Sequence, residues 1–146
     1  MSVELPVAPV DDVIRRRADG LRVSAEAGET LARRIQQEGA RRAQAAATVA
    51  DEDGRKTLMA SDFGGGAVPD KAGLDLPIAP VDRVARLDID DRYRVSMDAR
   101  IVLAAQLEEY AEDIAAAAAF LARHAGRRTI KSEDVEGYFE LKQYFG

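Results

Sequence analysis

The sequence of 146 residues contains no cysteine and one histidine, His124. Without cysteine the chain forms neither a disulfide nor a thiolate metal site, and a single histidine cannot build a histidine-rich metal centre. We therefore expect no metal and no cofactor, and a reducing cytoplasm as the location. The sequence also lacks an apolar run long enough to span a bilayer. Its acidic, proline-broken stretch at 1–12 is not typical of a signal peptide, so we expect no membrane contact.

Lysine is also scarce, because 17 of the 21 basic residues are arginine. The formal net charge is −5, divided into −1 for residues 1–72 and −4 for residues 73–146. Net charge governs solubility and long-range steering. An acidic total argues against a nucleic-acid partner, but a local basic surface can still bind DNA where the acids lie elsewhere.

Several short motifs occur twice, 71 or 72 residues apart. They are LPVAPVDDV (5–13) and LPIAPVDRV (76–84), LRVS (21–24) and YRVS (93–96), GRKTL (54–58) and GRRTI (126–130), and MASDF (59–63) and KSEDV (131–135). Four motifs in the same order, with a change of one residue in their spacing, indicate an internal duplication.

Each half predicts a short helix, a long helix and a third helix. Serine N-caps precede, and glycines follow, two alanine-rich stretches without proline, which we expect to form long helices at 25–52 and 97–124. In the second of these an apolar stripe recurs at helical spacing. It consists of Ile101, Leu107, Ile114, Ala118 and Leu121. Such a helix cannot bury its stripe alone, so we expect the two halves to pack on each other.

The third helices differ between the halves. In the second half the helix after Lys131 has an apolar face made by Val135, Tyr138, Phe139, Leu141 and Tyr144. In the first half MASDF runs directly into GGGAVP, which stops a helix after at most one turn. We expect a first domain at 1–63, a linker at 64–74 and a second domain at 75–146.

This helix pattern, with the motifs LPxAP, RVS and ARHAGRRTIKSED, resembles the archaeal histones. The resemblance is strong over residues 76–136 and weaker between the motifs of the first half. It implies an all-α fold of two histone folds in a handshake within one chain, like the doublet histones of salt-loving archaea. It also implies a nucleoid protein that binds and bends or wraps duplex DNA with little sequence specificity, for chromatin organisation or global transcription control.

The resemblance further implies where DNA is contacted. In the family, the loop before one long helix lies beside the loop after the other, and this pairing occurs at both ends of the handshake. The positions that match the family's contacts are Arg22 and Arg94 for the minor groove, Lys56, Thr57, Arg128 and Thr129 for phosphates, and Arg15, Arg83 and Arg86 for the backbone beside the first helices. Asp12 replaces the counterpart of Arg83, so we expect weaker phosphate binding there unless the neighbouring arginines at 16–17 compensate.

Two further sets of residues match structural features of the family. The pairs Arg55–Asp62 and Arg127–Asp134 match a salt bridge that closes the loop after each long helix. The residues Leu121, His124 and Asp134 match the surface through which one handshake meets the next. The first half has Val49 and Glu52 instead, so we expect two chains to associate through their second halves only, giving four histone folds.

Other interpretations of the sequence are weaker. No nucleophile–histidine arrangement is present and GGGAVP is not a phosphate-binding loop, so we expect no enzyme. The alternative is a histone-fold adaptor that binds proteins and hardly binds DNA, which the acidic total favours and the retained loop arginines oppose. Arg33, Arg34 and Arg41 are typical of a solvated helix face. Arg42 aligns with Ile114, where an apolar residue is expected, so the first fold could be less regular.

Overall fold

The computed structural model describes residues 3–145 and is all-α, with five helices in that span. The first half contains α1 (Val7–Arg17), β1 (Arg22–Val23), α2 (Ala25–Glu52), β2 (Thr57–Leu58) and the 3₁₀ turn η1 (Ala60–Phe63). The second half contains the 3₁₀ turn η2 (Lys71–Gly73), α3 (Ile78–Ala85), β3 (Arg94–Val95), α4 (Met97–His124), β4 (Thr129–Ile130) and α5 (Ser132–Phe145). The predicted bounds of both long helices are confirmed.

Local sequence sets the ends of the long helices. The hydroxyl oxygens of Ser24 and Ser96 each accept the backbone N–H three residues on, at 3.0 and 3.1 Å. After the helices, Gly54 and Gly126 have φ angles of 71° and 74°, in the left-handed region that glycine adopts without a Cβ clash. The predicted N-caps and C-terminal glycines are confirmed.

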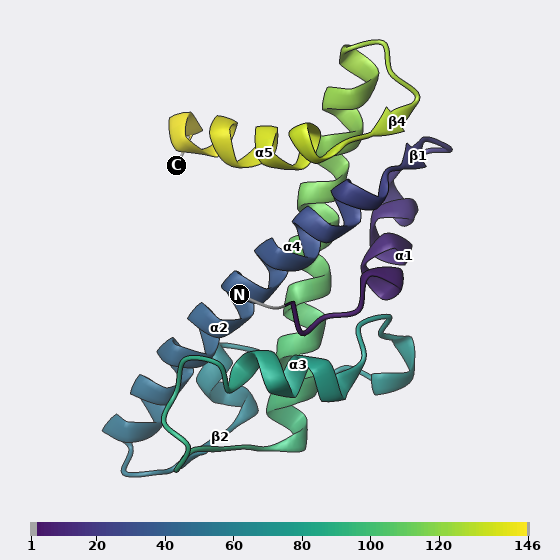
Figure 1. Ribbon diagram of the computed structural model, residues 1–146. Helices are drawn as coiled ribbons and strands as arrows, with labels where there is room; N and C mark the ends of the chain where they lie inside the picture. Colours follow the sequence, from purple (N-terminus) through teal and green to yellow (C-terminus); the bar gives the residue numbers. More distant parts are fainter. Residues whose placement is uncertain (1–2, 146) are drawn as a thin grey trace.

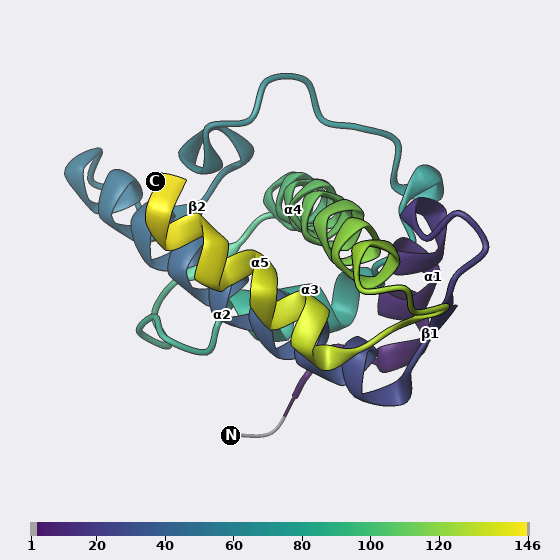
Figure 2. The same ribbon diagram turned by 90° about the horizontal axis from the view of Figure 1, so that it is seen from above.

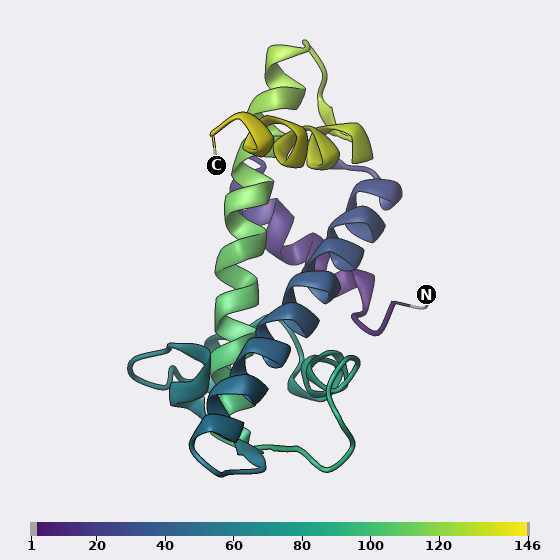
Figure 3. The ribbon, with the colours of Figure 1, turned by 90° about the vertical axis from the view of Figure 1, so that its left-hand side faces the viewer.

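The two long helices cross, and the short helices of each half pack on the long helix of the other half (Figure 1). Helix α1 contacts α4, helix α3 contacts α2, and α5 lies across both long helices. The crossing is also seen from the side in Figure 3. The two halves therefore form the single intramolecular handshake that the sequence predicts.

Both halves contribute to one apolar core around the crossing. The largest fully buried side chains of the long helices are Leu31, Ile35, Leu103, Leu107 and Ile114. Alanines fill much of the remaining interface and let the helices approach closely. No helix between residues 3 and 145 is long and apolar enough to cross a bilayer.

Gly39 lies where α2 closely approaches side chains of α3 and α4. A Cβ at this position would lie 2.7 Å from Cγ1 of Val84 and 3.0 Å from Cδ1 of Leu107. Glycine weakens an isolated helix by about 1 kcal/mol relative to alanine. Here the absence of a side chain lets α2 pack closely against Val84 and Leu107, and any larger residue would force them away.

The first half ends in the short turn η1 in place of a third helix, as predicted. Gly64 follows with a φ of 75° and ends the turn. The chain then passes along the outer side of α4 to reach the second half (Figure 2). Gly65 packs against Val102 there, so closely that a Cβ would lie 2.7 Å from its Cγ1.

Helix α5 buries less of its predicted apolar face than expected. Val135 is buried, and Tyr138 and Phe139 are partly buried against the core. Leu141 and Tyr144 are 46% and 80% exposed, so this apolar face extends beyond the part of α5 that packs on the core. The packing surface of α2 and α4 ends before the last turn of α5.

Arg42 does not interrupt the first fold, because its polar groups have partners. Its Nε donates to Glu38 at 2.7 Å and its Nη1 donates to Gln106 at 3.1 Å. Its guanidinium lies 5.8 Å from the ring centroid of Tyr110. Helix α2 is continuous through this position, so the expected irregularity is absent from it.

Candidate nucleic-acid interface

One end of the handshake joins the loop before α2 to the loop after α4. The strands β1 and β4 are parallel, with Arg22 opposite Thr129. The N–H of Arg22 donates to the carbonyl of Arg128 at 2.9 Å. We call residues 19–24 and 123–131 the β1–β4 end. Two strands that are far apart in the sequence thus lie side by side at this end of the molecule (Figure 1).

The opposite end repeats this arrangement with the halves exchanged. The strands β2 and β3 are parallel, with Thr57 opposite Arg94, and the N–H of Arg94 donates to the carbonyl of Lys56 at 2.8 Å. We call the repeat-equivalent residues 51–59 and 91–96 the β2–β3 end. Each end therefore brings an arginine of one half beside a threonine and a basic residue of the other.

An ion pair closes the loop after α2. The Nη2 of Arg55 lies 2.8 Å from Oδ1 of Asp62, and its Nη1 donates to the carbonyl of Thr57 at 2.9 Å. The hydrogen bond from Arg55 lowers the pKa of Asp62 against the opposing effect of burial. The side chain of Asp62 is 1% exposed. A pair with one buried partner holds the strand that carries Thr57 in a fixed conformation.

The loop after α4 has the same brace. Arg127 donates to both carboxylate oxygens of Asp134 at 2.6 Å, and to the carbonyl of Thr129 at 3.2 Å. Burial acts to raise the pKa of Asp134, but hydrogen bonds from Arg127 and the N–H of Lys131 outweigh it, so the pKa is lowered. Both carboxylates therefore stay ionised, and the two loops are rigid supports.

Three of the expected DNA contacts are exposed arginines with free guanidinium groups. Arg22, Arg94 and Arg128 make no side-chain ion pair or hydrogen bond to the described part of the chain. A guanidinium without an internal partner is available for phosphate or for a groove edge. These three side chains are the best-placed cations of the two ends.

Three other expected contacts already have internal partners. Lys56 Nζ lies 2.9 Å from Oδ1 of Asp51, and Arg83 Nε lies 3.9 Å from Oε1 of Glu4. Arg86 pairs with Asp82 at 3.1 Å and donates to a backbone carbonyl of the following loop. The remaining basic residue of the expected set, Arg15, is exposed on α1.

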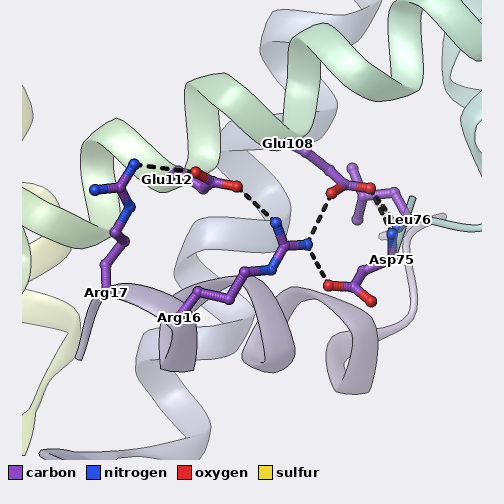
Figure 4. A network of polar contacts seen from close by, with 6 residues as sticks. All are labelled: Arg16, Arg17, Asp75, Leu76, Glu108 and Glu112. Atoms are coloured by element: carbon purple, nitrogen blue, oxygen red, sulfur yellow. Dashed lines mark hydrogen bonds and ion pairs between the residues drawn. The ribbon is translucent and has the colours of Figure 1, made fainter. Parts of the chain in front are cut away.

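The arginines next to Arg15 form ion pairs with acidic residues of the same chain (Figure 4). Arg16 pairs with Asp75, with Glu108 at 2.8 Å and with Glu112 at 2.6 Å. Arg17 pairs with Glu112 at 3.2 Å. These bonds connect α1 to α4. We therefore do not expect Arg16 or Arg17 to replace the phosphate contact that is missing at Asp12.

Two of the three arginines expected on a solvated face of α2 pair with acids. Arg34 donates to Glu136 of α5 and its guanidinium carbon lies 4.0 Å above the ring of Phe139. Arg41 lies 2.6 Å from the carboxylate of Glu38 within the same helix. Arg34 therefore contributes to holding α5, which its sequence context did not indicate.

The surface expected to join two chains lies where α4 ends. His124 is exposed and stacks on Phe120, with ring centroids 5.8 Å apart and Phe120 60% exposed. Leu121 is partly buried beside α5, and Asp134 is buried in the loop brace. Association through these residues stays a prediction.

A comparison with protein families fits this geometry. The model of histone-like transcription factors (CBF/NF-Y) and archaeal histones matches residues 3–63 and 74–137. The chain belongs to this family. It is an archaeal histone-fold protein with two histone-fold regions, and the family implies DNA binding and compaction without enzymatic activity.

Two relatives are similar to this histone-fold protein. An archaeal histone of Thermococcus zilligii, HAN1, is 52% identical over 61 residues, which are 42% of this chain and 88% of the relative. The crystal structure of the histone from Methanopyrus kandleri has a TM-score of 0.68 and 28% identity, over 90% of this chain and 91% of that one. The second relative is thus similar over nearly the full length of both chains.

Proposed function

We propose that this chain is a doublet histone that binds and bends duplex DNA through its backbone and minor groove. The two strand pairings carry this proposal, since they set Arg22 beside Thr129 and Arg94 beside Thr57. A cation beside a hydroxyl forms a suitable phosphate contact at each end. The exposed arginines suit a narrow minor groove, where negative potential is concentrated.

Little sequence preference follows from this mode of binding. Phosphate contacts fix register but carry no base information, and the minor groove distinguishes bases poorly. Two contact points at opposite ends of one rigid body favour a bent duplex. Arg15, Arg83 and Arg86 would support the duplex between the ends.

The test is fluorescence anisotropy with a short labelled duplex at several KCl concentrations. We expect binding that weakens steeply with salt, because each phosphate contact adds about 0.9 to the slope of log K against log salt. The double substitution Arg22→Ala/Arg94→Ala should weaken binding at least roughly tenfold. The matched control, Arg33→Ala/Arg41→Ala, removes the same charge from α2 and should change binding far less.

A second candidate function is a histone-fold adaptor for other proteins. Its support is the net charge of −5 and a family model that includes histone-like transcription factors. If the wild type does not bind duplex DNA even at low salt, the adaptor is favoured and the DNA-binding proposal fails.

We further propose the domains 1–63 and 75–146 with a linker at 64–74, and an association of two chains through the second domain. The two matched segments support the boundaries. The exposed Phe120 and His124 support the association, whereas the first half has Val49 beside three consecutive acids at 51–53. Such a protein would work on the chromosome in the cytoplasm, and its acidic, arginine-rich surface fits a high-salt cell.

A further inference from the structure

The two ends of the handshake differ in charge although they are equivalent in the repeat. The β1–β4 end carries five arginines or lysines and one aspartate. The β2–β3 end carries four arginines or lysines and four acids. A DNA phosphate therefore meets a net positive end on one side and a neutral one on the other.

Much of this difference arises at one position. Asp51 lies at the end of α2, and its repeat equivalent at the end of α4 is Arg123. One oxygen of Asp51 lies 2.9 Å from Nζ of Lys56, and the other accepts the hydroxyl of Tyr93. The ammonium group of Lys56 also lies 5.0 Å from the ring centroid of Tyr93. We call these three residues the Asp51 clasp.

The β1–β4 end has no such clasp. Arg128 is the equivalent of Lys56, and its guanidinium is free of partners in the described residues. Arg123 replaces Asp51 and Leu21 replaces Tyr93, so neither the carboxylate that pairs with Lys56 nor the hydroxyl that donates to that carboxylate is present. The basic residue at this phosphate-contact position is thus unpaired among the described residues at the β1–β4 end and paired with Asp51 at the β2–β3 end.

We propose, on the basis of the proposed function, that the chain binds DNA phosphate mainly at the β1–β4 end. At the β2–β3 end, the Asp51 clasp keeps Lys56 in an internal ion pair. A phosphate that approaches Lys56 must displace a carboxylate at hydrogen-bond distance and lie beside its negative charge. Bonds from Tyr93 and Lys56 lower the pKa of Asp51, so this carboxylate stays charged. Binding is then one-sided, and Asp51 sets the strength of the second contact.

The experiment measures duplex affinity and salt slope by anisotropy for full-length variants. We expect Arg128→Ala to weaken binding roughly fivefold or more and to lower the salt slope by about 0.9, while Lys56→Ala changes affinity less than about twofold. Asp51→Asn should tighten binding roughly three- to tenfold and raise the slope, because it releases Lys56. Adding Lys56→Ala to Asp51→Asn should abolish the gain.

The control is Glu140→Gln, which removes the same charge from an exposed position on α5 away from both ends. Circular dichroism melting of each variant verifies that the fold is retained. Equal losses for Lys56→Ala and Arg128→Ala, or an Asp51→Asn variant that binds no tighter than Glu140→Gln, would overturn the inference. Absence of binding by the wild type at low salt would instead overturn the DNA-binding proposal, and this inference with it.

Discussion

Asp11 on α1 and Asp82 on α3 are equivalent in the repeat but differ in their partners. Asp82 pairs with Arg86 and Arg100, each at 3.1 Å. The equivalent of Arg100 is Gly28, and Oδ1 of Asp11 is buried without a hydrogen-bond partner among residues 3–145. Burial raises the pKa of Asp11, which Arg15 opposes and its acidic neighbour reinforces. A carboxyl with a raised native pKa favours folding when protonated, so its contribution is full below about pH 4 and is lost as pH rises through the native pKa.

We therefore predict that Asp11→Asn unfolds less readily than wild type at neutral pH, and that the difference disappears towards about pH 4. The measurement is urea unfolding of both proteins across this range. Asp113→Asn, at an exposed position on α4, is the control and should keep the wild-type pH dependence. A difference between Asp11→Asn and wild type that is constant with pH would contradict the assignment.

At the scale of elements, Glu108 connects α4 to both halves of the chain. Its Oε2 accepts the N–H groups of Asp75 and Leu76 at 2.6 and 2.9 Å, while Oε1 pairs with Arg16 (Figure 4). The equivalent residue on α2, Gln36, accepts the N–H of Glu4 at 2.7 Å. Each long helix thus holds the segment that enters the short helix of its own half, and Glu108 also holds the other half through its ion pair with Arg16.

Glu108→Ala should lower the free energy of unfolding by about 2–4 kcal/mol, because two backbone N–H groups lose their acceptor and Leu76 is buried. Glu108→Gln should lower it by only about 1 kcal/mol, since an amide oxygen can still accept, as in Gln36. The control is Glu112→Ala one turn later, which breaks only pairs with exposed arginines and should cost less than about 1 kcal/mol. Denaturant unfolding that gives equal losses for both alanine variants would refute this role.

At the scale of the whole molecule, the C-terminal ends of α2 and α4 carry different residues, and this difference predicts how chains associate. We expect light scattering to give a mass of two chains for the wild type without DNA. Leu121→Glu should give one chain, because it sets a charge in the proposed contact beside Phe120. Val49→Glu makes the same type of change at the equivalent position of the first half and should leave the mass of two chains unchanged. A mass well beyond two chains, or dissociation by Val49→Glu, would contradict association through the second half.

Much of the fold could be predicted because its signals are local or repeated. Ser24 and Ser96 cap helices through neighbouring residues, and the repeat spacing, with the family resemblance, predicted which loops meet. The bonds of Glu108, and the bond between Asp51 and Tyr93, could not be predicted, because these partners are 32 to 92 residues away and show no periodic pattern. The exposure of Leu141 was missed for a related reason, since helical spacing predicts a face but not where its packing partner ends.

The linker along α4 removes a constraint that applies to proteins built from identical subunits. Where two copies pair about a twofold axis, every contact surface must complement itself, and folding depends on protein concentration. Here the two halves of the handshake come from one chain, at a ratio fixed by the covalent link. A substitution in one half is therefore never imposed on its counterpart, so Arg16 can acquire acidic partners while its equivalent is Leu87. Folding of the handshake should also be a unimolecular reaction, with a midpoint that dilution does not change wherever single chains predominate.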